Sequence, residues 1–207
     1  MSLKWSKSFA IGETPVLVLI EAAIDWGGMV GIMSCKLKQT SQKGYGVFAE
    51  RNIKAGECIF QVDLSQLKRY TLAEIDSNPD LDGDHSDYVG HGKYAIDDSL
   101  ASYVNHSCDP NCYYKMHSIA RKDMYALRDI HVGEELTHDY AATAVDQFAD
   151  AAGDTAWVLD CKCGSLNCRD KVKGDFFGLS QELQRRYYAN LPPSVKRKYR
   201  HLFESDH

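Results

Sequence analysis

The chain has 207 residues, of which 44% are hydrophobic and 26% are charged, and its formal net charge is −5. This length suits one domain of ordinary size with short appendages, and the acidic balance argues against a chain-wide electrostatic grip on nucleic acid. Seven cysteines are an odd number, and three of them fall within residues 161–168. That pattern disfavours a disulfide framework and favours metal binding by an intracellular protein, in the cytoplasm or the nucleus.

The N-terminal stretch 15–33 is apolar enough to raise the question of a membrane span. Glu21 and Asp25 interrupt it, and acids near the middle of a span or inside a secretory signal are costly. We therefore expect no membrane association. Residues 1–32 are interpreted as an extension that packs on the core, as a strand or helix, or as a segment preceding a natural start at Met33.

Short strands are predicted along the first half of the chain. Runs of β-branched, aromatic or alternating residues occur at 16–20, 35–40, 46–50 and 58–62, with Gly and Asn between them. Further strands are expected at 93–96 and 123–127. Cys35, Cys58 and Cys112 are expected to be small core residues. This spacing predicts a core built mainly of β-strands.

Helical signals are few and lie outside these strands. Thr71 followed by Glu74 predicts one capped helical turn. Residues 80–87 hold four acids and suit an exposed loop better than a cation site, and residues 141–153 suit a short helix or mobile connection. Ser180 and Ser194 are expected to cap two helices near the C-terminus.

The C-terminal segment differs from the rest in charge. Residues 171–207 hold eight Lys/Arg and four Asp/Glu. Contact with nucleic acid or with an acidic protein is one interpretation. The solvated outer faces of two amphipathic helices are the interpretation we favour here.

Four sequence blocks occur in a fixed order: K-G-Y-G-V-F-A at 43–49, N-H-S-C-D-P-N at 105–111, G-E-E-L-T-H-D-Y at 133–140, and C-K-C-G-S-L-N-C-R at 161–169. Together they resemble SET-domain protein lysine methyltransferases with a cysteine-rich post-SET zinc segment. The resemblance implies a β-rich (α+β) fold of several small sheets with a threaded C-terminal segment, plus short C-terminal helices. It implies a SET domain over 33–141, a connection and post-SET zinc loop over 142–170, and a basic helical segment over 171–207.

The resemblance also implies a binding site for S-adenosylmethionine. A G-x-G lets the backbone approach a ligand closely, although G-Y-G alone also suits a hairpin turn. An amide suits the cofactor's zwitterionic end, although Asn before His also suits an Asx turn. The implied cofactor-binding residues are Lys43, Gly44, Tyr45, Gly46, Tyr88, Asn105, His106, Tyr140 and Leu166.

Tyr140 is the implied catalytic residue. A lysine amine of pKa about 10.4 is neutral in only about a thousandth of molecules at pH 7.4, and only the neutral amine attacks a methyl group. An aromatic channel disfavours the ammonium form, and a phenol orients the amine. His138, where the family has Phe or Tyr, is expected to tune the number of methyls added. The structural alternative is that Tyr140 is a core residue closing a strand.

The cysteines predict a zinc site. Cys161, Cys163 and Cys168 supply three thiolates on a tight loop, and a structural site needs four. The resemblance supplies the fourth from Cys108, with Cys112 as the rival and a disulfide or free thiols as the alternative. It also implies that Leu166, with Trp157 just before the loop, packs near the adenine.

The function implied is methyl transfer from S-adenosylmethionine to a lysine of a protein substrate, histone or other. The family's Tyr-x-Gly is replaced by Gln61-Val62-Asp63 and its Arg-Phe by Ser102-Tyr103. These departures leave open a catalytically silent module that binds cofactor or peptide. A purely structural zinc module is a third possibility, but it leaves the G-x-G and Tyr140 without a role.

Overall fold

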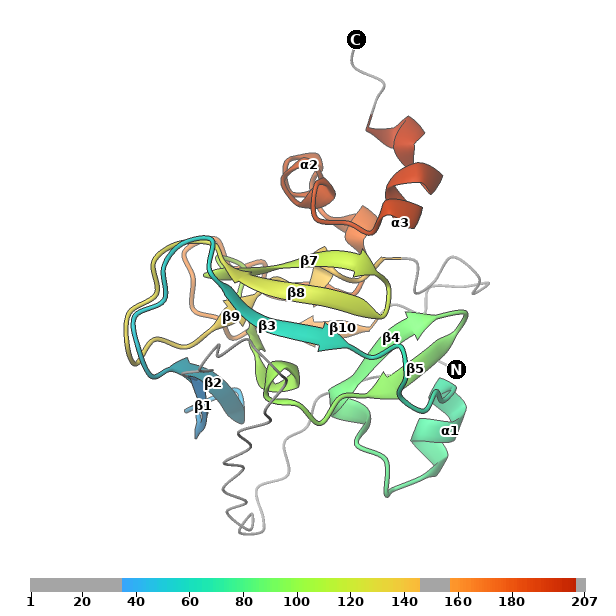
Figure 1. Ribbon diagram of the computed structural model, residues 1–207, viewed down its shortest axis with the longest axis horizontal. Helices are drawn as coiled ribbons and strands as arrows, with labels where there is room; N and C mark the ends of the chain where they lie inside the picture. Colours follow the sequence, from blue (N-terminus) through green and yellow to red (C-terminus); the bar gives the residue numbers. More distant parts are fainter. Residues whose placement is uncertain (1–34, 146–156, 204–207) are drawn as a thin grey trace, which may run out of the picture.

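The computed structural model describes residues 35–145 and 157–203 (Figure 1). The strand predicted at 16–20 and the apolar stretch at 15–33 lie outside these residues. Within the described ranges, every helix is too short or too polar to cross a membrane.

The fold is a set of small antiparallel sheets around a first hydrophobic core. Its centre is a three-stranded sheet in the order β3-β8-β7, and two hairpins, β1-β2 and β4-β5, flank it. The strands are β1 (Cys35–Gln39), β2 (Tyr45–Ala49), β3 (Cys58–Asp63), β4 (Ser86–Gly90), β5 (Lys93–Ile96), β7 (Cys112–Ser118) and β8 (Arg121–Ala126). Val47, Phe60, Met124 and Leu136 are among the side chains that fill this core.

Between β3 and β7 the chain forms α1 (Leu72–Ser77), two 3₁₀ helices, η1 (Gly83–His85) and η2 (Leu100–Tyr103), and the two-residue strand β6 (Asn105–His106). After β8 come β9 (Thr137–His138) and η3 (Tyr140–Ala142). β6 pairs with β9 in parallel, which is the one parallel pairing in the described residues.

The C-terminal part has a second hydrophobic core. A small antiparallel pair, β10 (Val158–Asp160) and β11 (Lys171–Lys173), leads into η4 (Phe176–Gly178), α2 (Gln181–Tyr188), α3 (Pro193–Lys198) and η5 (Arg200–Leu202). Figure 1 shows α2 and α3 together on one side of the molecule, beyond β7. Phe176, Tyr187, Leu191 and Val195 are buried there with Met116 of β7.

The structure confirms most local predictions. Thr71 caps α1 in a full capping box with Glu74, and Ser180 caps α2. Ser194 does not cap α3: the helix begins at Pro193, whose ring pre-sets the first turn. The strands β4, β6, β7, β9, β10 and β11 were not predicted.

One core prediction is wrong. Cys112 is fully buried and Cys35 packs on the first core, but Cys58 is exposed. The register of β3 shifts between Cys58 and Phe60, and this irregularity takes Cys58 out of the inward-facing row.

Candidate active site and metal centre

The parallel strands β6 and β9 bring together two motifs that lie about thirty residues apart. Asn105 faces Thr137, and His106 faces His138. Asn111 holds the two segments together: its side-chain amide donates to the Glu135 carbonyl at 2.8 Å, and its amide oxygen accepts from the Thr137 N–H at 2.8 Å. The Asn111 side chain thus forms the hydrogen bonds with the Glu135 carbonyl and the Thr137 N–H that the backbone of another strand would otherwise form.

Tyr140 follows directly on this pairing. Its hydroxyl donates to the Val104 carbonyl at 3.1 Å, and the ring centroids of His138 and Trp157 lie 4.9 and 6.2 Å from its own. Burial raises the pKa of Tyr140 well above its ordinary value, so the phenol stays protonated at physiological pH. The result is one polar oxygen held among aromatic rings.

His106 links Tyr140 to the cysteines. Its Nδ1 accepts from the Tyr140 backbone N–H at 3.2 Å, so the ring proton is on Nε2, which lies 3.3 Å from Cys108 Sγ. Burial, with the nearby positive charges of Arg169 and Lys43, lowers the pKa of His106 to about 3. The imidazole is therefore neutral, and it bridges the Tyr140 backbone N–H and the Cys108 thiol.

A second cluster of polar side chains surrounds Gly46. Lys43 Nζ lies 2.7 Å from Glu135 Oε2, and Asn105 Nδ2 donates to Glu135 Oε1 at 2.8 Å and to the Tyr45 carbonyl at 2.9 Å. A Cβ on Gly46 would lie 2.6 Å from Glu135 Oε1 and 2.8 Å from Asn105 Nδ2. Glycine is therefore required at this position by close approach.

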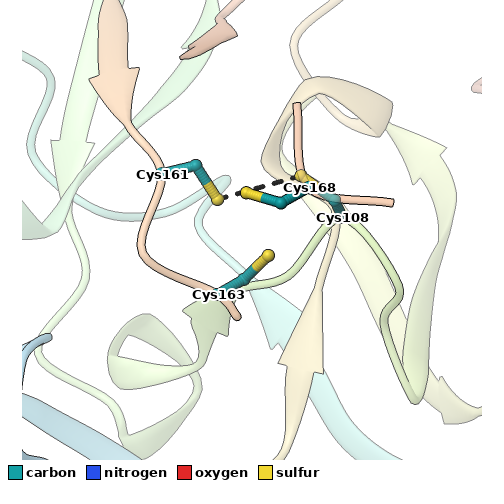
Figure 2. A group of neighbouring side chains, drawn as sticks. All are labelled: Cys108, Cys161, Cys163 and Cys168. Atoms are coloured by element: carbon teal, nitrogen blue, oxygen red, sulfur yellow. Dashed lines mark hydrogen bonds between the residues drawn. The ribbon is translucent and has the colours of Figure 1, made fainter. Parts of the chain in front are cut away.

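Four thiols form a candidate metal centre. Figure 2 shows the side chains of Cys108, Cys161, Cys163 and Cys168 gathered around one point, and all four Sγ atoms lie within 4.8 Å of one another. Sulfurs in a tetrahedral zinc site with bonds of about 2.3 Å are about 3.8 Å apart. Cys108 Sγ and Cys161 Sγ are 3.8 Å apart, and all four cysteines are free thiols. The donor set fits zinc, and it includes Cys108 rather than Cys112.

Local structure shapes the loop between β10 and β11. The Cys161 N–H donates to the Asp170 carbonyl at 2.6 Å, which closes the loop at its base. Gly164 has a φ of 71°, which lets the backbone turn inside the loop. Burial opposes ionisation of Cys163, but hydrogen bonds from Ser165 and from backbone amides lower the pKa of this thiol to about 6. A thiolate is the form that binds a metal.

Comparison with known proteins identifies the domain to which the central part of the chain belongs. Residues 44–141 match the family model of the SET domain. The chain contains a SET domain. It is 33% identical over 144 residues to the histone-lysine N-methyltransferase TRX1 of Oryza sativa subsp. japonica, a match that covers 62% of this chain and 13% of that protein. It is also 33% identical over 150 residues to the probable histone-lysine N-methyltransferase set-23 of Caenorhabditis briggsae, covering 65% of this chain and 58% of that protein.

Among solved structures, this chain is similar to the crystal structure of KRYPTONITE in complex with mCHG DNA and SAH. The TM-score is 0.46 with 24% identity, and the match covers 66% of this chain and 28% of that chain. The chain spans less than two thirds of the length of the relatives described above.

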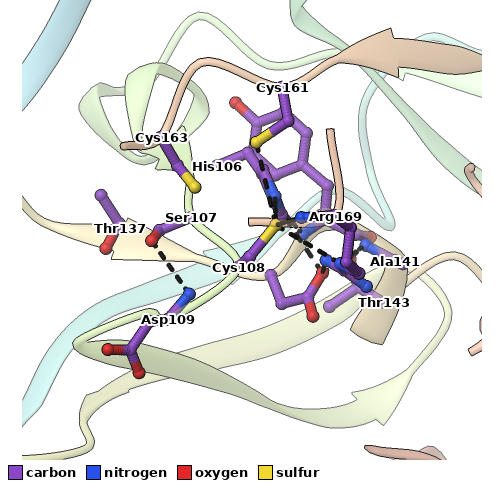
Figure 3. A network of polar contacts seen from close by, with 12 residues as sticks. His106, Ser107, Cys108, Asp109, Thr137, Ala141, Thr143, Cys161, Cys163 and Arg169 are labelled. Carbon is purple, nitrogen blue, oxygen red and sulfur yellow. Dashed lines mark hydrogen bonds and ion pairs between the residues drawn. The ribbon is translucent and has the colours of Figure 1, made fainter. Parts of the chain in front are cut away.

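Arg169 connects the cysteines to the SET domain (Figure 3). Its backbone N–H and Nε donate to Cys108 Sγ at 3.3 and 3.4 Å, and its Nη2 lies 2.6 Å from Asp139 Oδ1. The Tyr187 hydroxyl of α2 donates to the other Asp139 oxygen at 3.3 Å. The network therefore runs from a candidate metal ligand, past the residue before Tyr140, to the C-terminal helices.

Several of these residues were missed from sequence. Arg169 and Asp139 lie within the quoted motif blocks, which was the available signal, whereas Tyr187 lies in a segment with no motif. Glu134 and Glu135 are both ion-paired, and Glu135 in addition contacts Asn105.

The two remaining predicted cofactor residues are Tyr88 and Leu166. Tyr88 is buried in β4, where its ring packs edge-on against Tyr94 with centroids 5.4 Å apart. Leu166 projects fully into solvent from the cysteine loop. Trp157, by contrast, packs beside Tyr140 and over Gly174, where an added Cβ would collide with its indole.

Proposed function

We propose that this chain transfers a methyl group from S-adenosylmethionine to the ε-amine of a lysine in a protein substrate. The observation that supports this most directly is the protonated Tyr140 phenol, held on the Val104 carbonyl inside a SET domain. The relatives named as histone-lysine N-methyltransferases support a histone or another protein as substrate. Such a substrate places the reaction in the nucleus or the cytoplasm.

The polar group around Gly46 suits the amino-acid end of the cofactor. A zwitterion needs both a cationic and an anionic partner, and Lys43 and Glu135 supply one of each beside the Asn105 amide. We assign cofactor contacts to Lys43, Gly44, Tyr45, Gly46, Asn105, His106 and Tyr140, with Tyr88 and Leu166 retained as further candidates.

When bound, S-adenosylmethionine supplies an electrophilic methyl group on a sulfonium sulfur. The protein must present a neutral amine in line with it, because an ammonium has no lone pair. The rings of His138, Trp157 and Tyr140 lie close together, and an amine that is desolvated on entering between them has a lower pKa, which favours its neutral form. The Tyr140 oxygen and the Val104 carbonyl, 3.1 Å apart, are positioned to orient the amine hydrogens.

The zinc site has a structural role in this proposal. Cys108, Cys161, Cys163 and Cys168 would hold one Zn²⁺, and Arg169 would offset the negative charge of a four-thiolate site. The ion would fix the loop between β10 and β11 beside Trp157 and Tyr140.

His138 is proposed to restrict the number of methyls. Its ring is buried against Tyr114 and Tyr140, with centroids 4.8 and 4.9 Å from theirs. A polar ring that holds a water would leave less room for a growing methylated amine, which favours mono- or dimethylation. Mass spectrometry should show a shift toward higher methylation in His138→Phe, and an identical product distribution would refute this role.

The function is tested by incubating the chain with methyl-labelled S-adenosylmethionine and a protein extract, then locating the label. Label on lysine ε-amines is expected. The competing function is a silent module that binds cofactor or peptide, which the absence of the family's Tyr-x-Gly favours. Tight cofactor binding without any label transfer, on histones or extract, would establish that alternative instead.

Gly46→Ala should weaken S-adenosylmethionine binding by about tenfold or more in calorimetry. The new methyl group must displace Glu135 or Asn105, and a lost charge-assisted hydrogen bond costs about 1.5–3 kcal/mol.

Gly56→Ala is the matched control for this substitution. It has a φ of +80° and nothing within 4 Å of its added Cβ. It should cost about 1 kcal/mol of stability through strain and leave affinity unchanged. Equal affinities for wild type and Gly46→Ala would remove this site from the proposal.

A further inference from the structure

The C-terminal helices have a strongly basic outer surface. Residues 171–203 contain eight Lys/Arg and two Asp/Glu, whereas residues 35–145 contain 12 Lys/Arg and 17 Asp/Glu. We name the basic helical surface by six residues on three neighbouring elements: Arg185 and Arg186 of α2, Lys196, Arg197 and Lys198 of α3, and Arg200 of η5.

Packing fixes the direction in which these charges point. The apolar side chains of Tyr187 in α2, Leu191 in the turn after it and Val195 in α3 are buried in the second core with Met116. Arg186 and Arg197 are exposed. Figure 1 shows α2 and α3 on one side of the molecule, well away from β1, β2 and α1. The arginines and Lys198 are exposed on the solvent side of the second core, whereas Lys196 is half-buried and its ammonium donates to the Ala189 carbonyl.

The composition of this face indicates the kind of partner. Interfaces between proteins have a centre of apolar and aromatic side chains, and helices that lie on membranes expose an apolar face. In residues 171–203, Leu202 is the one exposed large apolar side chain. A surface of guanidinium and ammonium groups without an apolar centre instead suits the phosphate backbone of a nucleic acid. Binding is favoured because neutralising the phosphates releases the counterions condensed on them.

The basic helical surface is also joined to the candidate active site. Tyr187 lies next to Arg186 on α2 and donates its hydroxyl to Asp139, the residue before Tyr140. The helix that carries Arg186 is therefore hydrogen-bonded to the segment that carries Tyr140.

We propose that the basic helical surface binds the phosphate backbone of double-stranded DNA, without reading its sequence.

The test is binding of a short fluorescent DNA duplex of mixed sequence to the full chain, measured by anisotropy over a salt series. Wild type should bind with an affinity that falls linearly on a log–log plot against salt. Arg186→Glu combined with Arg197→Glu should lower affinity at low salt by about tenfold or more and reduce the slope by about 2. Arg186→Gln with Arg197→Gln should show a smaller loss in the same direction.

Lys36→Glu with Lys54→Glu is the matched control. It reverses two exposed lysines of the β1–β3 region and should leave both affinity and slope closer to wild type than either arginine pair does. Circular dichroism checks that each variant folds. If the double glutamate variant does not fold, the affinity of the double glutamine variant tests the inference.

Two results would overturn the inference: no binding of the duplex by wild type at low salt, or arginine pairs that bind as wild type does. Binding to polyglutamate but not to DNA would assign the surface to an acidic protein and overturn it as well. Because duplex binding needs no methyl transfer, label transfer without DNA binding refutes this inference alone, and DNA binding without label transfer refutes the proposed function alone.

Discussion

Tyr140→Phe is expected to lower kcat by about a hundredfold or more and to leave S-adenosylmethionine affinity nearly unchanged. The hydroxyl that donates to Val104 at 3.1 Å is lost, whereas the backbone bond from Tyr140 to His106 and the ring contacts remain. A positioned polar group is typically worth this much in the chemical step. Single-turnover kinetics with calorimetry of cofactor binding separate the two effects.

Tyr187→Phe is the matched control, because it also removes a buried phenol oxygen. That change breaks the hydrogen bond to Asp139 and should lower the free energy of unfolding by about 1 kcal/mol with a much smaller loss of kcat. Full activity in Tyr140→Phe, or equal losses of kcat in both variants, would remove Tyr140 as the catalytic residue.

The rate of wild type should rise with pH above neutrality. Below the substrate amine's pKa of about 10.4, the fraction of the amine that is neutral, and therefore reactive, grows about tenfold with each pH unit. Burial raises the pKa of Tyr140 above its ordinary value of 10.0, so the phenol keeps its proton over the same range. The rise should therefore follow the amine rather than the phenol until the protein unfolds.

Purified chain is expected to contain one zinc ion, and removing the ion should weaken S-adenosylmethionine binding by about tenfold. The strands that close the cysteine loop, β10 and β11, have three residues each, so the order of the loop depends on the metal. Trp157, which starts this segment, packs beside Tyr140, and loss of loop order should thus reach the cofactor. Metal analysis and calorimetry before and after chelation measure both effects.

Cys163→Ser should lose the zinc, whereas Cys58→Ser, which changes an exposed thiol outside the cluster, should retain it. Folded protein without zinc after a chelator wash and zinc reloading would contradict the metal assignment. Equal cofactor affinity with and without zinc would contradict only the coupling between the loop and the cofactor.

Features that depend on a few neighbouring residues were determined by the sequence alone. The capping box of Thr71 and Glu74, the cap at Ser180 and the strand after Gly44 were predicted because their hydrogen bonds and backbone angles involve residues close in the chain. The cysteine spacing predicted three thiols on one loop for the same reason. The motif blocks identified the SET domain before any contact was known.

Only the tertiary structure decided which distant groups meet. Lys43 and Glu135 pair across 92 positions of sequence, Arg169 reaches Cys108 across 61, and Tyr187 reaches Asp139 across 48. No local pattern encodes such contacts, because they follow from the parallel pairing of β6 with β9 and from the packing of α2 on the second core.

Burial has the same origin, because a side chain is covered by segments that are remote in the sequence. Cys58 and Cys112 are both cysteines at the start of a strand, yet Cys58 is exposed and Cys112 is fully buried. Leu166 is apolar but projects into solvent. The sequence alone therefore determined the chemical groups of the site, and the long-range packing of two cores decided their arrangement.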